Sequence, residues 1–256
     1  MSTQPITREQ ILAAIKAALE PRDDVNAMWE GGAASFKRVD EWSDIDLQVD
    51  VADARVAEVI AATEHALASL APIALRYEFP QPTWHGHAQI FYRLRDASDF
   101  LLLDFVVIQH SHANKFLEPA IHGNAVVHFD KANVVAPPPF DANAHRAKLR
   151  ARVETLRVTF ELFRVFVLKE LNRHNDVEAL MFYHSFTLRP LVEVLRIQHA
   201  PTRYNFHTRY VYSDLPAQVV RELEPLFFVA HADDLRAKRE RAEGWFRVAL
   251  EQICWE

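Results

Sequence analysis

The sequence predicts an α+β protein, in which a mixed β-sheet with flanking helices is followed by an α-helical bundle. Two observations support this fold class. Helix-like and strand-like patterns alternate as far as three consecutive prolines at 137–139, and only helix-like patterns follow them. Because three prolines continue neither a helix nor a central strand, we place the domain boundary there, with one domain at 1–136 and a second at 137–256.

The first domain is expected to begin with a helix. Thr7 opens a Thr-x-x-Gln capping box, and apolar residues follow at helical spacing: Ile11, Leu12, Ile15 and Leu19. A short strand at 25–30 then leads to a glycine turn, a longer strand is expected at 42–51, and an alanine-rich helix at 52–70.

Three more strand-like runs complete the sheet, at 73–79, 87–94 and 100–108. The links between them are short and contain turn-forming residues. Links of this length predict antiparallel neighbours.

The second domain is expected to hold four or five helices. Its first helix carries an apolar face built from Leu149, Val153, Leu156, Phe160, Phe163 and Val167. A second apolar face, formed by Val158, Leu162, Val165 and Phe166, predicts that this helix is buried on two sides. Further helices are expected at 177–198, 215–229 and 233–254, with Pro190 kinking or splitting the first of these.

The composition is that of a soluble globular protein: of 256 residues, 50% are hydrophobic and 25% charged. Residues 1–10 show no signal-peptide pattern, and the most apolar run, at 100–108, is too short to cross a bilayer. Cys254 is the only cysteine, which excludes a disulfide within one chain and fits a reducing compartment. We therefore expect a cytoplasmic protein that does not enter the membrane.

The charge is unevenly distributed. Residues 1–136 contain 11 Lys and Arg against 19 Asp and Glu, a net charge of −8, whereas residues 137–256 contain 18 against 16, a net charge of +2. An acidic first half suits metal ions and cationic substrates, and it argues against a nucleic-acid groove there.

The feature of greatest functional interest is a glycine turn, Gly31-Gly32, followed by Asp44 and Asp46 at the start of an apolar strand. Side chains alternate along a strand, so the two carboxylates face the same way, roughly 7 Å apart. Two such groups repel each other unless a cation lies between them, and carboxylate oxygens are the ligands of magnesium. The alternative is a solvated strand edge.

A third carboxylate, Asp104, lies inside the apolar run 101–108. A lone charge is costly to bury without a partner. One explanation is an ion pair with an arginine or a strand bulge. The other is a metal site of three carboxylates, in which one member also takes the proton from an attacking hydroxyl.

A Gly-Gly turn, an Asp-x-Asp pair and a later Asp on another strand together resemble the nucleotidyltransferases of the DNA polymerase β superfamily. The early position of the motif and the helical second half look like the small aminoglycoside adenylyltransferases. The motif resemblance covers about residues 25–108.

The resemblance implies that Asp44, Asp46 and Asp104 hold two Mg²⁺ ions, with ATP as the nucleotide donor. It also implies that Gly31 and Gly32 let the backbone approach the triphosphate, at the start of a short helix expected at 34–38.

The chain departs from the family where a serine usually follows the glycines, because Ala33 stands there. Three readings stay open. Ser35 takes the place of that serine, or backbone amides and a cation (Lys37 or Arg38) carry the phosphate contact, or nucleotide binding is weakened.

Other patterns are less specific. The pairs His85/His87 and His110/His112 are spaced like zinc ligands, but no third and fourth ligand is evident. The sequence contains no Gly-x-Ser-x-Gly turn, so we do not expect a serine hydrolase. The segment 203–212, rich in aromatics and arginines, lines a pocket or is a packed loop pinned by tyrosines. One helical glutamate can serve as a base or hold a cationic substrate: Glu154, Glu161 or Glu193.

The first functional hypothesis is a metal-dependent nucleotidyltransferase (EC 2.7.7 type) that moves NMP, foremost AMP from ATP, onto a small-molecule hydroxyl such as that of an aminoglycoside-like antibiotic. The alternatives are a protein-modifying adenylyltransferase of the toxin-neutralising type and a nucleotide-binding protein with weak or no transferase activity. An RNA-tailing enzyme ranks lower, because the catalytic half is acidic and no basic tail is present. The acceptor, the nucleotide preference and the oligomeric state are not encoded in any pattern we recognise.

Overall fold

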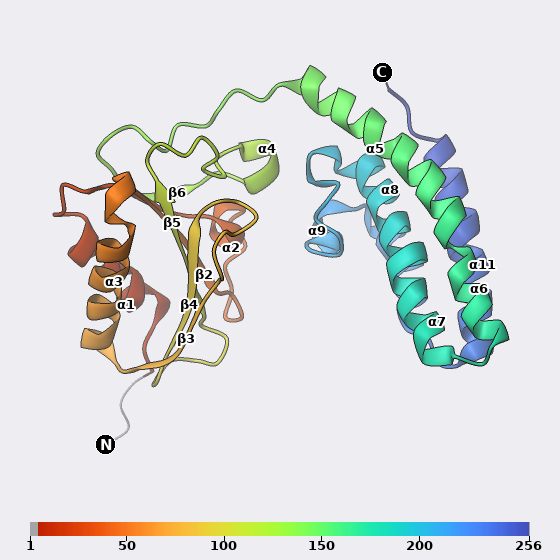
Figure 1. Cartoon of the computed structure of the whole chain (residues 1–256), viewed down its shortest axis with the longest axis horizontal. Helices are drawn as coiled ribbons and strands as arrows, with labels where there is room; N and C mark the ends of the chain where they lie inside the picture. Colours follow the sequence, from red (N-terminus) through yellow and green to blue (C-terminus); the bar gives the residue numbers. More distant parts are fainter. Residues whose placement is uncertain (1–4, 256) are drawn as a thin grey trace. The chain divides into compact units, whose positions relative to one another are not determined.

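The structure, a computed structural model, describes residues 5–255 and divides the chain into two compact units, one ending at Phe140 and the other beginning at Asp141. The first unit contains a six-stranded mixed sheet and the second is helical, so the molecule belongs to the α+β class (Figure 1). No helix among residues 5–255 is both long and apolar enough to span a lipid bilayer.

The elements of the first unit are α1 (Arg8–Leu19), β1 (Val25–Glu30), α2 (Gly32–Ser35), β2 (Ile45–Val51), α3 (Val56–Leu70), β3 (Ile73–Glu78), β4 (Ala88–Leu94), β5 (Leu103–Gln109), α4 (Pro119–His122) and β6 (Val126–Asp130). The strands lie in the order β3-β4-β5-β2-β1-β6. Only β2 and β5 run parallel, and every other neighbouring pair is antiparallel.

Helix α1 begins as the sequence predicts. The Thr7 side chain accepts a hydrogen bond from the backbone of Gln10, and the Gln10 side chain bonds back to Thr7, which completes the capping box. The antiparallel pairing of β3 with β4 and of β4 with β5 also confirms what their short links predict.

The two faces of the sheet are covered to different extents. One face packs against α1 and α3, and its core includes Ile45, Leu47 and Phe105. The opposite face is only partly covered, by a smaller cluster around Trp29 and Ile108. Because side chains alternate along β2, placing Ile45 and Leu47 in the large core turns Asp46 to the less covered face.

Several boundaries in this unit differ from the sequence prediction. The strand expected at 42–51 begins at Ile45, because Trp42 and Ser43 lie in a turn closed by hydrogen bonds to the Asp40 carboxylate. The strand expected from residue 100 begins at Leu103, and the short helix expected at 34–38 lies at Gly32–Ser35. Strand β6 and helix α4 were not predicted.

The helical unit comprises α5 (Ala142–Phe163), α6 (Val165–Asn172), α7 (Asp176–Tyr183), a π-helical turn (His184–Leu188), α8 (Arg189–His199), α9 (Val211–Asp214), α10 (Ala217–Leu223) and α11 (Ala232–Glu251). Its core includes the stacked rings of Phe160 and Phe246, 3.6 Å apart between centroids. The described residues after Asp141 contain no strand, as the sequence predicts.

Pro190 splits the helix expected at 177–198, also as predicted. A proline has no N–H to donate to the carbonyl four residues earlier. The residues just before Pro190 form a π-helical turn, which separates α7 from α8.

The prediction that the first long helix is buried on two sides was wrong. It breaks at Arg164 into α5 and α6, and its second apolar face lies open, with Val158 and Leu162 each 58% exposed. Helical periodicity identifies an apolar face, but it does not show whether a partner covers that face.

Candidate functional site

Two aspartates lie opposite each other near one end of the two parallel strands, and a third lies in the chain just before this end. In the β2–β5 register Asp46 stands opposite Asp104, on strands that are about 4.8 Å apart. Asp44 lies one residue before β2. All three side chains are partly buried. The pairing of β2 with β5 therefore brings together carboxylates that are far apart in the sequence.

The glycine turn packs directly on this group. The Gly31 N–H donates to the main-chain carbonyl of Asp46 at 2.9 Å. Gly32 has a φ of +49°, and a Cβ placed on it would lie 1.5 Å from Oδ2 of Asp46. Only glycine leaves room for the Asp46 carboxylate here.

We expect Gly32→Ala to displace the Asp46 carboxylate and to lower the activity proposed below by about 100-fold, since a shift of about 1 Å at a reacting group has this effect. The positive φ should also lower the free energy of unfolding by about 1–2 kcal/mol. Steady-state kinetics and urea unfolding measure the two effects.

Gly244→Ala is the matched control, because a Cβ at Gly244 meets nothing within 4 Å and the residue lies inside α11. It should leave activity unchanged. Equal activity in the two variants would contradict the close approach of the turn to Asp46.

The other residues predicted for phosphate binding differ in exposure: Ser35 is buried, whereas Lys37 and Arg38 are exposed. Ser35 is buried, and its hydroxyl lies 2.8 Å from the Gly32 carbonyl and 2.5 Å from the His122 carbonyl, so it joins α2 to α4. Lys37 and Arg38 are exposed just after α2, with the Arg38 guanidinium 5.2 Å from the centre of the Phe36 ring.

The backbone amides of Gly32 and Ala33 lie in the first turn of α2, where N–H groups have no partner within the helix.

Behind the aspartates lies a charged group that sequence reasoning missed. Arg8 of α1 donates to the main-chain carbonyl of Asp44 at 2.5 Å and forms an ion pair with Glu30. Glu30 is only 4% exposed and also contacts His128 of β6 at 2.9 Å. These contacts fix the chain on both sides of the glycine turn.

Gln89 of β4 was missed as well. Its Nε2 lies 2.8 and 2.9 Å from the two carboxylate oxygens of Asp104, and its Oε1 lies 3.1 Å from Nε2 of His85. Gln89 belongs to no recognisable motif, and the spacing of His85 suggested only a zinc site. The pairing of β4 with β5 is what reveals the link of these residues to Asp104.

In the structure the pair His85/His87 stays together, whereas His110 and His112 separate. The rings of His85, His87 and His112 are close together, with the last two 4.3 Å apart between centroids, whereas His110 binds Asp50. Across residues 5–255, no group of three or more His, Cys, Asp or Glu side chains is arranged to hold a metal ion.

His87 is 2% exposed, and neither ring nitrogen has a hydrogen-bond partner in the described part of the chain. Burial, with a smaller effect of His112 and His85, lowers the pKa of His87 to about 4. A group whose pKa is lower in the folded than in the unfolded state stabilises the fold above the unfolded pKa of about 6.5, and that stability is lost as the pH falls towards about 4.

We therefore expect His87→Phe to lose less stability on acidification than the wild type, by up to about 3 kcal/mol. Urea unfolding at several pH values between 7.5 and 4 measures this difference. His65→Phe on the exposed side of α3 is the control and should follow the wild type. Parallel pH curves for all three proteins would contradict the assignment.

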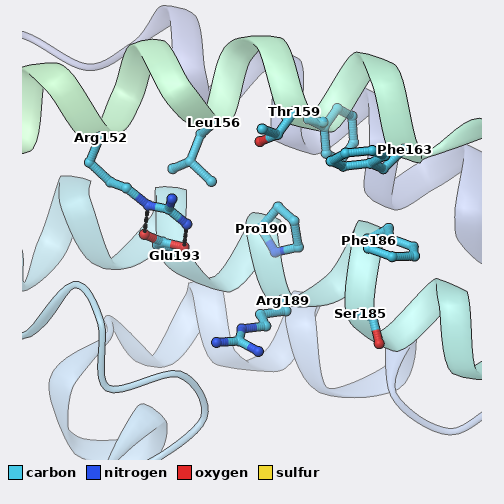
Figure 2. Close-up of a pocket in the computed structure, with 10 residues that line it drawn as sticks. Arg152, Leu156, Thr159, Phe163, Ser185, Phe186, Arg189, Pro190 and Glu193 are labelled. Atoms are coloured by element: carbon cyan, nitrogen blue, oxygen red, sulfur yellow. Dashed lines mark hydrogen bonds and ion pairs between the residues drawn. The ribbon is translucent and has the colours of Figure 1, made fainter. Parts of the chain in front are cut away.

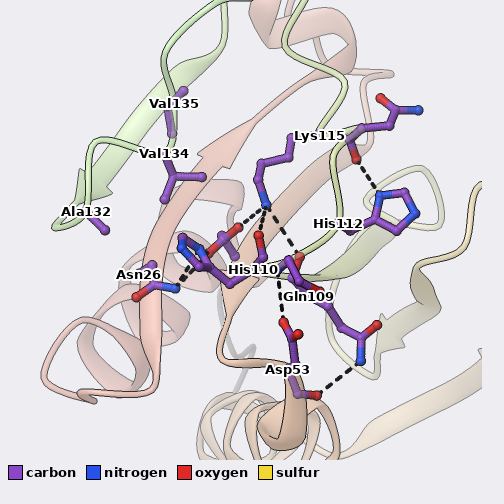
Figure 3. Close-up of polar contacts among 12 residues, drawn as sticks. Asn26, Asp53, Gln109, His110, His112, Lys115, Ala132, Val134 and Val135 are labelled. Carbon is purple, nitrogen blue, oxygen red and sulfur yellow. Dashed lines mark hydrogen bonds and ion pairs between the residues drawn. The ribbon is translucent and has the colours of Figure 1, made fainter.

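Asp50 forms a second buried group on the same face of the sheet, near the far end of β2. It is 0% exposed, and it accepts hydrogen bonds from Lys115 at 2.5 Å and from Asn26 at 2.8 Å, with His110 also at 2.8 Å. Lys115 also donates to the carbonyls of Gln109 and His110 (Figure 3). This cluster ties the loop after β5 to the sheet, and it is not part of the aspartate group.

Among the described residues of the helical unit, one pocket has a volume of about 280 Å³ and another of about 270 Å³. The first lies between α5 and α8, with the Arg152–Glu193 ion pair at one end and Phe163 and Phe186 at the other (Figure 2). The second is lined by Arg189 and His207, among others.

Of the three helical glutamates considered from the sequence, Glu193 alone lines one of these pockets. Its carboxylate is bound by Arg152 at 2.5 and 2.8 Å. Glu154 is exposed beside Arg157, and Glu161 pairs on the surface with Arg164 and Arg247.

The segment 203–212 is a packed loop, but its anchor is an arginine. Arg196, which is 0% exposed, donates to the carbonyls of Arg203, His207 and Arg209 and to the carboxylate of Asp214. Tyrosines contribute as well: Tyr204 packs against the helical core, and the Tyr212 hydroxyl donates to Glu224 at 2.6 Å. His207 and Thr208 of the loop line the second pocket.

The aspartate group suits magnesium in its chemistry, since its donors are carboxylate oxygens on adjacent strands. In the described conformation the three do not converge: Asp104 is bound by Gln89, and Asp46 lies against Gly32.

The sequence matches no protein-family model and no curated protein. Among solved structures, an aminoglycoside 6-adenyltransferase from Bacillus subtilis is similar over 96% of this chain and 90% of its own, at 14% identity and a TM-score of 0.36. A TM-score of this size does not establish a shared fold. We therefore base the functional proposal on this chain's own residues.

Proposed function

We propose that the chain is a magnesium-dependent nucleotidyltransferase that transfers NMP, foremost AMP from ATP, to a hydroxyl group of a small molecule. The observation that supports this most is the meeting of Asp46 and Asp104 in the β2–β5 register, with the Gly31-Gly32 turn packed against Asp46. The sequence resemblance to polymerase β-type nucleotidyltransferases assigns the same three aspartates and the same turn.

In this proposal Asp44, Asp46 and Asp104 hold two Mg²⁺ ions. When bound, these ions supply the positive charge that neutralises the triphosphate and lowers the pKa of the attacking hydroxyl. Asp104 would also accept the proton of the attacking hydroxyl, a role that one carboxylate of a metal-binding group can take as general base.

The glycine turn would bind the triphosphate. The N–H of Gly31 is bonded to Asp46, so we assign the phosphate contact to the amides of Gly32 and Ala33 rather than to that of Gly31. The Ser35 hydroxyl faces two main-chain carbonyls, which favours Lys37 or Arg38 as the additional phosphate ligand. Both cations are exposed beside the turn.

The acceptor is expected to be cationic, such as an aminoglycoside-like antibiotic, because residues 1–136 carry a net charge of −8. Antibiotic resistance is the biological role that such an acceptor would indicate.

The test is transfer of label from α-labelled ATP, GTP, CTP and UTP, with magnesium, to aminoglycosides, lincosamides or the proteins of a cell extract. We expect label from ATP on a small molecule. Label on a polypeptide would replace this proposal with a protein-modifying adenylyltransferase.

One observation favours a second candidate, a nucleotide-binding protein with weak or no transferase activity. Ala33 lacks a hydroxyl, and that of Ser35 is turned to Gly32 and His122, so a phosphate ligand usual in the family is missing. Measurable ATP binding with no label on any acceptor would support this candidate and overturn the first.

A further inference from the structure

A continuous chain of hydrogen bonds runs from the main chain of the loop before β4 to the carboxylate of Asp104. The main-chain N–H of His87 lies 3.1 Å from Nδ1 of His85, Nε2 of His85 lies 3.1 Å from Oε1 of Gln89, and Nε2 of Gln89 lies 2.8 and 2.9 Å from the carboxylate oxygens of Asp104.

The chemistry of its two ends assigns a direction to every bond in this series. A main-chain N–H can only donate, so we assign Nδ1 of His85 as the acceptor, without a proton. The Thr83 hydroxyl lies 3.3 Å from the same nitrogen but donates to the His87 carbonyl at 2.7 Å. The neutral ring then has its proton on Nε2, which donates to Oε1 of Gln89. An ionised carboxylate only accepts, so the Gln89 amide must turn its NH₂ group to Asp104, in agreement with the first two bonds.

The His85 ring is held by packing as well as by hydrogen bonds. It lies edge-on to Trp84 and Phe116, with centroid distances of 5.0 and 5.8 Å, and 5.1 Å from the ring of the buried His87. A ring fixed in this way can orient the Gln89 amide, because a rigid acceptor or donor limits the rotation of its partner.

We propose that Gln89 and His85 are positioning residues that hold the Asp104 carboxylate in one orientation next to Asp46. Asp104 needs such positioning because the β2–β5 pairing places it directly opposite Asp46. Two like charges on adjacent strands repel, and the free rotation of Asp104 would let it turn away. The positive end of the Gln89 amide dipole offsets part of this repulsion and directs the oxygens. This inference rests on the proposed function only for its catalytic consequence.

The first experiment concerns the chain itself and requires neither metal nor substrate. NMR of uniformly ¹³C,¹⁵N-labelled protein reports the tautomer of His85 from its ring nitrogen and carbon shifts. We expect the Nε2–H tautomer in the wild type and a mixture of tautomers in Gln89→Leu. The Nδ1–H tautomer in the wild type would overturn the proposal whatever the protein's activity.

The second experiment measures the effect on Asp104. We expect Gln89→Leu and His85→Leu to weaken Mn²⁺ binding, followed by electron paramagnetic resonance, and to lower kcat, each by about 10-fold or more, as loss of a group behind a ligand does. The KM for ATP should change little. His85→Gln, whose amide nitrogen can reach the position of Nε2, should restore most of both.

Gln109→Leu is the matched control, because Gln109 lies on the same strand as Asp104 but is exposed and binds Asp53 instead. Unchanged or tighter Mn²⁺ binding in Gln89→Leu would overturn the positioning role. If Asp104→Asn bound Mn²⁺ as the wild type does, Asp104 would not be a ligand, and the proposed function would be contradicted. The His85 tautomer would still show whether the series of hydrogen bonds from His87 to Asp104 forms.

Discussion

Asp46→Asn should abolish nucleotidyl transfer and leave the protein folded. Asp46 is the carboxylate on which the β5 register and the glycine turn converge, and an amide of the same shape removes its charge without changing its volume. We expect kcat/KM to fall on the order of 1,000-fold or more, as when a residue of a catalytic group is lost. Label transfer from α-labelled ATP measures the activity, and circular dichroism with urea unfolding measures the fold.

Asp99→Asn is the matched control for this change. The Asp99 side chain is 83% exposed and pairs with Arg93 on the surface, so its replacement should leave both activity and stability close to wild type. Full activity in Asp46→Asn would remove Asp46 from the mechanism.

Arg196→Met is expected to have the largest effect on stability. Arg196 and Asp214 are 0% and 1% exposed at their side chains, and Arg196 also holds three carbonyls of the loop 203–209. Removing the arginine leaves a buried carboxylate with only Arg203 and three carbonyls without this donor. We expect the free energy of unfolding to fall by about 3–5 kcal/mol.

Asp214 gives this prediction a pH signature. Burial alone would raise the pKa of Asp214, but hydrogen bonds from Arg203 and Arg196 outweigh it and lower the pKa. A lowered carboxyl pKa stabilises the fold above its ordinary value, and this stability is lost as the pH falls. In Arg196→Met the pKa of Asp214 should be lowered less, so the variant should lose less stability on acidification than the wild type.

The measurement is urea unfolding at neutral and acidic pH. Arg241→Met, an exposed residue of α11, is the control and should lie within about 0.5 kcal/mol of wild type. A loss of less than about 1 kcal/mol in Arg196→Met would show that the loop does not depend on this arginine.

Local patterns predicted the parts of the fold that depend on neighbours in the sequence. The Thr7 capping box, the alternation of Asp46 with buried Ile45 and Leu47, and the break at Pro190 all follow from contacts within a few residues. The missed strand β6 depends instead on pairing with β1, almost a hundred residues earlier. With Val126 and Val127 both exposed, its sequence lacks the alternation of a half-buried strand.

The candidate site, like the fold, could be predicted from the sequence only in part. The aspartates and glycines were predicted because their types and spacing form a motif, and their roles stay predictions. Arg8 and Gln89 belong to no motif, and the spacing of His85 suggested a zinc ligand rather than a partner of Gln89. These residues reach the site only through strand pairing and helix packing. Ser35 shows the converse: its position near the turn suggested a phosphate contact, but the fold places α4 against its hydroxyl.

The central claim is that this chain breaks the bond between the α- and β-phosphates of ATP and moves AMP to a hydroxyl. The most direct test supplies α-labelled and γ-labelled ATP in parallel, with Mg²⁺ and a panel of aminoglycosides, and repeats both with EDTA. We predict α-label on the acceptor and γ-label in pyrophosphate, both lost with EDTA. Label from the γ-position on the acceptor, or as free phosphate without α-label transfer, would contradict the account.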